Sequence, residues 1–158
     1  MTSTILVPID FNVESLNTLK IALEKHKQDK INVILMYAEY VSTSITELLF
    51  YSPDKSIQSL TNPTFNDALT ILKNSYESTI QSLNIELFSG YSVNAFKNFL
   101  EANNVDQVYI PQNYRLQVKK NGFDPIPLIK KSHIHFKEFA WSYENKSSND
   151  HELNQLFI

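Results

Sequence analysis

The stretch TILVPIDFNVESLNTLKIALEKHKQDKINVILMYAEY, residues 4–40, decides the fold. Residues 4–9 and 31–40 are nearly continuous apolar runs rich in β-branched side chains, which is typical of strands buried on both faces. Between them, apolar positions recur at steps of three and four residues and predict a helix that begins after an N-cap at Asn12 and ends near Lys27. These positions are Leu16, Leu19, Leu23 and His26. A strand, a helix and a second strand form a βαβ unit, whose crossover should be right-handed.

The remainder of the chain repeats this alternation of strand and helix. Thr64 and Asp67 resemble a capping box and predict the start of a long helix whose apolar face runs from Phe65 to Leu83. Further helices are expected at residues 46–51, 92–103 and 125–131, and further strands at 84–90, 106–110 and 133–139. This pattern indicates an α/β fold, a three-layer sandwich around a largely parallel sheet of five strands.

The length and the composition indicate a single globular domain. We expect this domain to span residues 1–141, and residues 142–158 to form a polar connection with a short docking segment. The formal charge of −3 argues against a general nucleic-acid binder. The start lacks the basic region of a signal peptide, and no stretch has the roughly 18 apolar residues of a membrane helix. With no cysteine in the chain, we expect a cytoplasmic protein whose partners are neither nucleic acids nor membranes.

Glycine is scarce, and this limits the kinds of site the chain can build. Only Gly90 and Gly122 occur, against roughly 7% of residues in an average protein. The glycine-rich phosphate motifs GxGxxG and GxxxxGK[ST] are therefore absent from the sequence. Neither a GxSxG elbow nor an HExxH motif occurs, so we assign no catalytic residue and expect a protein that is not an enzyme.

Three stretches resemble the universal stress protein family. ILVPIDFNVESLNTLKIAL at residues 5–23 is similar to the family's first strand and helix, INVILMYAEY at 31–40 to its second strand, and GFDPIPLIKKSHIHFKEF at 122–139 to its last helix and strand. The resemblance covers about residues 4–140. It implies a sheet of order 3-2-1-4-5, usually a homodimer, and in one subgroup ATP bound above the carboxyl ends of strands 1 and 4.

The ATP-binding subgroup carries a loop of pattern Gly-x2-Gly-x9-Gly-Ser/Thr after strand 4, and this chain departs from it. The first two glycines fall at Pro111 and Tyr114, the hydroxyl residue falls at Phe123, and only seven residues separate Tyr114 from Gly122. Pro111 has no N–H group, and Tyr114 adds a large side chain where backbone should approach phosphate. We therefore expect a degenerate member that lacks the glycine-rich ATP loop and holds no cofactor.

The resemblance also implies nucleotide-binding positions, functional or vestigial, that this chain keeps. They are Pro8, Asp10, Ala38 and Gly122. Asp10 matches the acidic residue near the nucleotide at the end of strand 1, and Ala38 matches a strand-2 position whose backbone lies close to adenine. An aspartate after a first strand can instead cap the helix that follows, and this alternative stays open for Asp10.

Arg115, Lys119 and Lys120 give the same loop three positive charges within six positions. They could contact an anion through side-chain charge, or they could form a solvated surface loop. The first possibility defines an alternative function, a module that binds an adenine nucleotide such as ATP, or another anionic small molecule, through Asp10 and the basic loop 115–120.

Four aromatic residues surround the end of the second strand and the segment after it. They are Tyr37, Tyr40, Phe50 and Tyr51. They could stack on a planar ligand, or they could simply belong to the core and anchor a loop.

The last predicted strand places His133 and His135 on one face. Two imidazoles do not complete a zinc site, so we interpret them as polar residues of an edge strand. Because the family often dimerises through this strand, His133–Phe139 is the predicted homodimer interface.

The leading hypothesis is a non-enzymatic, universal-stress-protein-like protein that acts in a stress response through dimerisation or a partner protein. The second hypothesis is the anion-binding module. A hydrolase or nucleotidyl transferase, known from related α/β proteins, comes third.

Overall fold

The computed structural model describes residues 2–41, 44–119 and 121–141. Its strands are β1 Ser3–Pro8, β2 Ile31–Ala38, β3 Ile80–Phe88, β4 Gln107–Pro111 and β5 Phe136–Phe139. They form one sheet of order β3-β2-β1-β4-β5, in which every neighbouring pair is parallel. The predicted fold class and strand order are confirmed. Residues 142–158, the predicted C-terminal connection and docking segment, lie outside the described residues.

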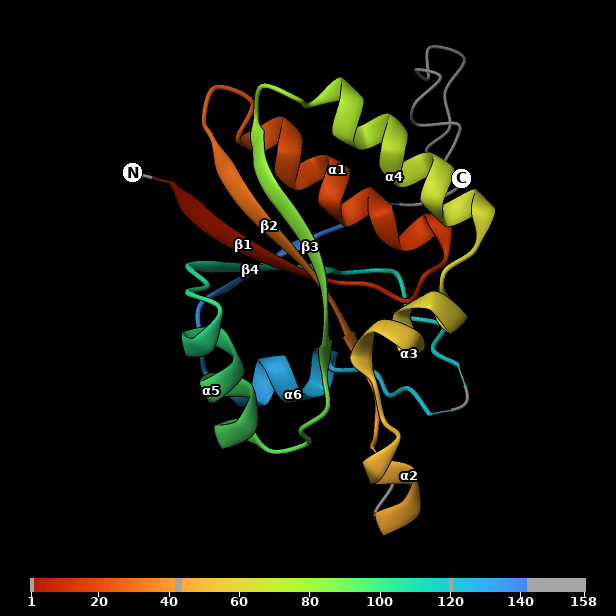
Figure 1. Cartoon of the computed structure of the whole chain (residues 1–158). Helices are drawn as coiled ribbons and strands as arrows, with labels where there is room; N and C mark the ends of the chain where they lie inside the picture. The colour runs from red at the N-terminus through yellow and green to blue at the C-terminus, as the bar shows by residue number, and fades with distance from the viewer. Residues whose placement is uncertain (1, 42–43, 120, 142–158) are drawn as a thin grey trace.

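Helices cover both faces of this sheet (Figure 1). The helical elements are η1 Val13–Ser15, α1 Leu16–Lys25, α2 Ile45–Leu49, α3 Pro53–Leu60, α4 Pro63–Ser75, α5 Val93–Ala102 and α6 Ile126–Lys131. Helices α1 and α4 lie over one face, and α5 and α6 lie over the other. Neighbouring residues of β1 point into different layers, because Ile5 and Val7 join the core with α1 and α4 whereas Leu6 joins the core with α5 and α6.

The sheet opens between the carboxyl ends of the central strand β1 and its neighbour β4. The β1–β2 register runs over six pairs from Ser3 to Pro8, whereas the β1–β4 register covers Ile5 and Leu6 alone. The chain crosses from β3 on one edge back to β4 on the other side of β1, so β1 and β4 flank the point where the strand order reverses. In open α/β sheets the crevice at such a point is the usual ligand site.

The second long helix ends earlier than the sequence pattern predicts. Helix α4 stops at Ser75, and β3 begins at Ile80 rather than at residue 84. A turn separates them, in which the N–H groups of Thr79 and Ile80 both donate to the carbonyl of Tyr76. Apolar residues at 76, 80 and 83 fit a helical period as well as a short strand, and this ambiguity made the prediction wrong.

The caps of two helices also differ from the prediction. The side chain of Asn62, and not Thr64, caps α4 by accepting the N–H of Phe65 at 2.9 Å, with Pro63 at the first helical position. Asn12 precedes the short turn η1, and its side chain forms no cap bond there. Helix α3, in the polar stretch between two prolines, is an element that the sequence pattern did not predict.

The last strand is shorter than predicted, because β5 begins only at Phe136. His133 has a positive φ of 59° in the turn after α6. Both His133 and His135 are exposed and lie outside the strand. The prediction that these histidines share one strand face is wrong, and an interface built on this strand must use residues 136–139.

Tyr76 gives the fold a specific sensitivity to alkali. Its side chain is almost fully buried, and burial together with the nearby Glu24 carboxylate raises the pKa of Tyr76 to about 12. The contribution of the neutral Tyr76 phenol to stability is therefore full below pH 10 and is lost as pH rises from about 10 to about 12. In that range the phenol ionises readily in the unfolded chain and not in the folded one. The loss amounts to about 2 to 3 kcal/mol.

We expect Tyr76→Phe to lose less stability than the wild type between pH 9 and pH 11.5. Urea unfolding at the two pH values measures the difference, and Tyr91→Phe, at an exposed tyrosine, is the matched control. Equal losses in the wild type and in Tyr76→Phe would contradict this assignment.

Candidate functional site at the carboxyl ends of β1 and β4

Asp10 lies at the centre of the crevice, two residues after β1, and its side chain is fully buried. One carboxylate oxygen, Oδ1, accepts the N–H of Asn12 at 2.9 Å and so shapes the turn before the first helix. The other oxygen, Oδ2, accepts the N–H of Gln117 at 2.7 Å and the hydroxyl of Tyr114 at 2.5 Å. Asp10 therefore holds the turn before the first helix, although the N-cap positions of η1 and α1 are Asn12 and Ser15, and it also holds the connection after β4.

We call this connection the β4 loop, residues 112–125, described here except for residue 120. Its second attachment is Tyr37, on β2, whose hydroxyl oxygen accepts the N–H of Lys119 at 3.0 Å. The Tyr37 ring is fully buried and packs against Phe11 with ring centroids 5.2 Å apart. Burial raises the pKa of Tyr37, partly opposed by the bond from Lys119, so the phenol is neutral at physiological pH.

The third attachment is made by backbone at the end of β2. The N–H of Phe123 donates to the carbonyl of Ala38 at 3.0 Å, and the N–H of Tyr40 donates to the carbonyl of Asn121 at 2.8 Å. Glu39 and Gly122 form an antiparallel bridge between these two bonds. The Ala38 carbonyl, where the resemblance places adenine, is thus hydrogen-bonded to the β4 loop.

Packing around Tyr114 completes the closure of the crevice. The Tyr114 ring lies 4.9 Å from the Trp141 ring with 30° between their planes. The indole Nε1–H of Trp141 donates to the hydroxyl of Thr18 on α1 at 3.1 Å. Leu116, also in the loop, is buried. The β4 loop therefore lies on the carboxyl ends of β1 and β2, hydrogen-bonded to Asp10 just after β1 and to Tyr37 and Ala38 of β2.

The predicted site residues separate into two groups. Asp10, Ala38 and Gly122 come together, and each contacts the β4 loop or belongs to it. Pro8 is buried at the end of β1 and pairs with Met36. Arg115 and Lys119 are exposed on the outside of the loop, and Lys120 lies outside the described residues.

A polar hollow remains on the outer side of the β4 loop. Its volume is about 410 Å³, and its lining residues are Asn12, Glu14, Asn113, Tyr114, Arg115 and Gln117. Of these, Arg115 supplies the positive charge and Glu14 the negative one. An anion bound here would face Arg115 on the surface of the loop.

The four aromatics near the end of β2 do not form one stacking site. Tyr37 is buried, whereas Phe50 is 79% exposed. Tyr40 is half-exposed and stacks on Phe123 at 4.7 Å. Tyr51 donates its hydroxyl to Glu39 at 3.3 Å, so it anchors the segment after β2.

The sequence did not reveal the role of Tyr114. It is an isolated tyrosine in a polar stretch, and its partners Asp10 and Trp141 are 104 and 27 positions away. The sequence predicted that this side chain would obstruct phosphate. It carried no signal that the hydroxyl would bind Asp10.

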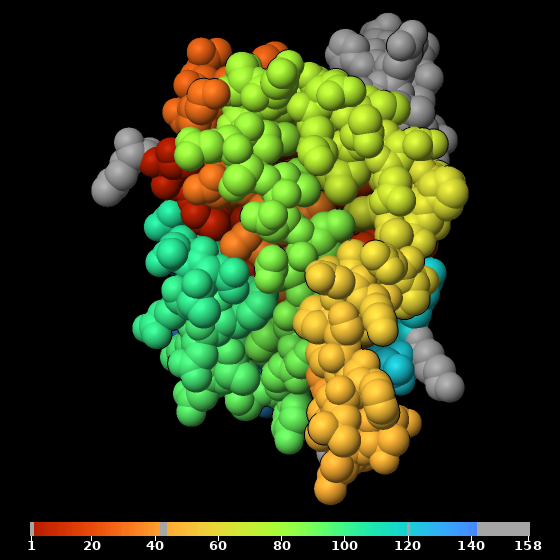
Figure 2. Space-filling view, in the orientation of Figure 1, coloured from red at the N-terminus to blue at the C-terminus, as the bar shows by residue number. Residues whose placement is uncertain are grey.

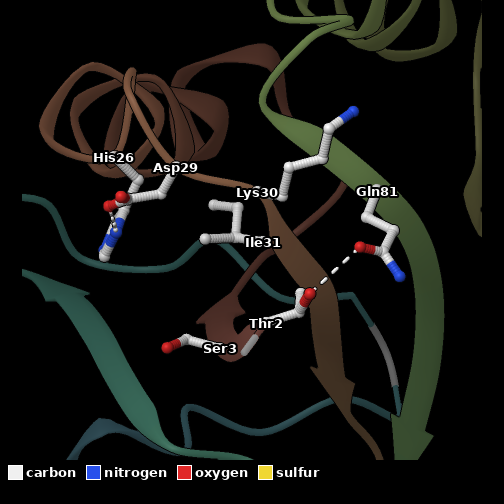
Figure 3. Close-up of a pocket in the computed structure, with 7 residues that line it drawn as sticks. All are labelled: Thr2, Ser3, His26, Asp29, Lys30, Ile31 and Gln81. Carbon is white, nitrogen blue, oxygen red and sulfur yellow. Dashed lines mark hydrogen bonds and ion pairs between the residues drawn. The ribbon is translucent and has the colours of Figure 1, made fainter.

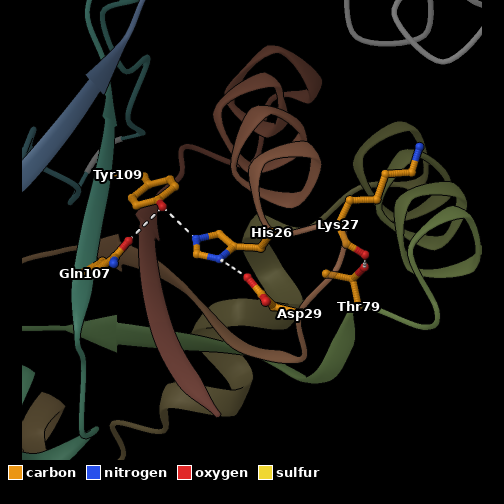
Figure 4. A network of polar contacts seen from close by, with 6 residues as sticks. All are labelled: His26, Lys27, Asp29, Thr79, Gln107 and Tyr109. Atoms are coloured by element: carbon orange, nitrogen blue, oxygen red, sulfur yellow. Dashed lines mark hydrogen bonds and ion pairs between the residues drawn. The ribbon is translucent and has the colours of Figure 1, made fainter. Parts of the chain in front are cut away.

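A second polar cluster lies at the opposite end of the sheet (Figure 4). The buried Tyr109 hydroxyl donates to Oε1 of Gln107 at 2.7 Å and also lies 2.7 Å from Nε2 of His26. Nδ1 of His26 lies 3.4 Å from Asp29. Burial raises the pKa of Tyr109, so the phenol stays neutral. The cluster links the end of α1 to β4.

Beside this cluster, His26 and Asp29 form one wall of a hollow of about 480 Å³ (Figure 3). Across it, the hydroxyl of Thr2 donates to Gln81 at 3.1 Å. Its lining residues are Thr2, Ser3, His26, Asp29, Lys30, Ile31 and Gln81. Lys30 and Asp29 give it charges of both signs, and no described group of three or more His, Cys, Asp or Glu side chains could hold a metal ion.

Within the described residues, no helix is both long and apolar enough to cross a membrane. No protein-family model and no curated protein matches this chain.

Solved structures with the same arrangement of elements do exist. Universal stress protein UspA from Lactobacillus plantarum matches over 87% of this chain and 96% of its own, with a TM-score of 0.53 and 8% sequence identity. A universal stress protein family protein from Arabidopsis thaliana with AMP bound matches over 93% of this chain and 97% of its own, with a TM-score of 0.51 and 8% identity. The resemblance in the three sequence stretches and the parallel sheet of order β3-β2-β1-β4-β5 agree with these matches: the chain has the fold of the universal stress proteins.

Proposed function

We propose that this chain is a non-enzymatic, universal-stress-protein-like protein of the cytoplasm that acts in a stress response through protein contacts and without ATP. The observation that carries the proposal is the attachment of the β4 loop. Asp10 and the Ala38 carbonyl, the two groups expected beside a nucleotide, already bind Gln117, Tyr114 and Phe123.

A nucleotide would have to displace these bonds before it could bind. The Asp10 carboxylate is fully buried and accepts three hydrogen bonds, so removing the loop would leave an unpaired buried charge. Bonds to charged groups contribute about 1.5 to 3 kcal/mol each, and two of the three come from the loop. ATP would therefore bind only by offsetting a cost of several kcal/mol.

The protein contacts we propose include a homodimer through β5. This strand is an edge of the sheet and pairs with β4 on one side. The carbonyl of Phe139 accepts the N–H of Gln112, so it points toward β4. Because backbone groups alternate along a strand, the N–H of Glu138 points outward, where a second copy could pair.

A second candidate function is favoured by the hollow beside Arg115. The Arabidopsis protein of the same fold has AMP bound, and the hollow of about 410 Å³ could accept an anionic group beside Arg115. In that case an adenine nucleotide or another anion would contact Arg115 on the outside of the loop.

Thermal unfolding with nucleotide distinguishes these functions. With millimolar ATP or AMP and magnesium, we expect the unfolding midpoint to move by less than about 1 °C, because the leading proposal has no nucleotide bound. A nucleotide that did bind, at a concentration a hundredfold over its Kd, would add about 2.7 kcal/mol to the free energy of unfolding and raise the midpoint by several degrees. Magnesium with tripolyphosphate is the control for ionic effects.

A rise of several degrees would contradict the leading proposal. If Arg115→Ala then abolished the rise and Lys97→Ala, at an exposed lysine on α5, preserved it, the second candidate would hold.

A further inference from the structure

A polar hollow lies at the amino ends of β1, β2 and β3, and we call it the amino-end hollow. Its volume is about 640 Å³, which falls in the range of small-molecule sites. Figure 2 shows the amino ends of β1 (red) and β2 (orange) at the surface, between β3 (green) and the end of α5 (teal). Asp10 and the β4 loop lie at the carboxyl ends of the strands, so this hollow is separate from the candidate site.

The floor of the amino-end hollow is a row of polar side chains on three neighbouring strands. In the sheet register Thr4 pairs with Asn32, and Asn32 pairs with Ser82, so the three side chains lie side by side on one face. Two residues further along the same face are Leu6 and Ile34, which belong to the core with α5 and α6. This face of the sheet therefore changes from apolar to polar beneath the hollow.

Thr4 is the residue whose surroundings point to a ligand. It is only 8% exposed, and it lines the hollow. Its backbone is paired, because its N–H donates to Oδ2 of Asp106 and its carbonyl accepts the N–H of Asp106, both at 2.8 Å. Its hydroxyl, in contrast, has no hydrogen-bond partner among the described residues. A nearly buried hydroxyl is unfavourable without a partner, and the hollow is where that partner can lie.

The other polar groups of the hollow supply both donors and acceptors. Oδ1 of Asn32 accepts the hydroxyl of Ser82 at 2.6 Å, which leaves the NH₂ group of Asn32 to donate. Asp106 uses Oδ2 for the N–H of Thr4 and offers Oδ1 as an acceptor. Two further amides in the lining are those of Asn84 and Asn104. A ligand that satisfies this lining must therefore both donate and accept hydrogen bonds.

The lining argues against several classes of ligand. Among the described residues that form it, none is Lys, Arg or His and the charged one is Asp106, so a phosphate or carboxylate group would be repelled. None of these described residues is aromatic, so a nucleobase would have no ring to stack on. An ammonium group only donates and would leave the NH₂ group of Asn32 without an acceptor. A neutral compound with several hydroxyl groups fits, since each hydroxyl both donates and accepts.

We propose that the amino-end hollow binds a neutral carbohydrate, a monosaccharide or disaccharide, whose hydroxyl groups bond to Thr4, Asn32 and Asp106. Ile34 also lines the hollow and offers an apolar contact for the C–H groups of a sugar ring. The affinity is weak, with a Kd on the order of 1 to 10 mM, because bonds to the ligand replace bonds to water. This site does not depend on the function proposed for the β4 loop.

Titration of the ¹⁵N-labelled full chain, followed by ¹H–¹⁵N NMR, tests the proposal. The probes are glucose, galactose, mannose, maltose, sucrose and trehalose, each added up to about 50 mM so that millimolar binding is visible. At least one sugar should shift the backbone signals of Thr4, Ser82 and Asn84 and the side-chain NH₂ signals of Asn32 along one binding curve. Sodium phosphate and ammonium chloride at the same concentration are the anionic and cationic controls, and neither should shift these signals.

Three substitutions locate the site. Thr4→Val keeps the branched shape and removes the hydroxyl, so it should raise the Kd for the sugar about fivefold. Asp106→Asn keeps an acceptor for the N–H of Thr4 and removes the charge, so it should raise the Kd about tenfold. Asn84→Ala, at an exposed position where folding is not in question, should raise it about threefold. Thr70→Val, at an exposed threonine of α4, is the matched control and should leave the Kd unchanged.

Several results would overturn the proposal. If none of the sugars shifts the signals of the hollow, the hollow holds water alone. If phosphate or ammonium shifts them and the sugars do not, the class of ligand is wrong. If a sugar shifts only signals of the β4 loop, it binds at the other end of the sheet. Binding as tight as that of the wild type in both Thr4→Val and Asn84→Ala would likewise exclude this hollow as the site.

Discussion

Replacing Asp10 with alanine should lower the free energy of unfolding by about 3 to 5 kcal/mol, because three hydrogen-bond donors lose one buried acceptor. The N–H groups of Asn12 and Gln117 and the hydroxyl of Tyr114 all point at this carboxylate. Since Asp10 is fully buried, water cannot replace the carboxylate without the β4 loop moving away. The substitution should therefore both destabilise the fold and release the loop.

Urea unfolding measures the loss of stability, and the chain's single tryptophan reports the release of the loop. Trp141 stacks on Tyr114, so acrylamide should quench its fluorescence more strongly in Asp10→Ala than in the wild type. Asp10→Asn keeps the acceptor for Asn12 and loses the charge, so it should cost about half as much.

Asp106→Ala is the matched control. This exposed aspartate accepts a single backbone bond, from Thr4 at 2.8 Å, at the other end of the sheet. Its loss should cost about 1 kcal/mol and leave the quenching of Trp141 unchanged. Equal effects of Asp10→Ala and Asp106→Ala would show that the β4 loop does not depend on Asp10.

The fold could be predicted from the sequence because its signals are local. The apolar runs at 4–9 and 31–40 are long and continuous, and both form buried strands. The errors fall where one short pattern fits two structures. Ile80 and Leu83 fit a helix as well as a strand, and only the pairing of β3 with β2 decides between them.

The site was less predictable because its contacts join distant parts of the chain. Asp10, Ala38 and Gly122 were identified through the resemblance, and they do lie together. Their partners in the β4 loop were not identified. Tyr114 meets Asp10 across 104 positions and Lys119 meets Tyr37 across 82, and no spacing rule connects residues so far apart.

Gly122 is the residue for which the resemblance and the structure imply different roles. In the resemblance it is the last glycine of a phosphate loop, whereas here a Cβ atom at this position would lie 2.4 Å from Oη and 2.9 Å from Cζ of Tyr37. It would also lie 2.9 Å from Cβ of Val118. No described glycine has a positive φ, so the backbone at Gly122 accepts a side chain and the obstacle is purely one of space.

Gly122→Val should therefore destabilise the protein by about 4 kcal/mol, and Gly122→Ala by about 2 to 3 kcal/mol, without any nucleotide being present. Tyr37 cannot move away from the added atoms, because its ring is fully buried against Phe11 and its hydroxyl oxygen accepts the N–H of Lys119. Urea unfolding of the protein without ligand measures both losses.

A double-mutant cycle with Tyr37→Phe identifies the cause. Tyr37→Phe alone should cost about 1 kcal/mol for the lost bond to Lys119. In Gly122→Ala/Tyr37→Phe the closest contact, to the hydroxyl oxygen, is gone, so the combined loss should be smaller than the sum by at least about 1 kcal/mol. If the two losses were additive, a clash with the Tyr37 hydroxyl would not be the reason that position 122 requires glycine. Coupling would instead show that the glycine serves to seat the β4 loop on the sheet, a role that requires no phosphate.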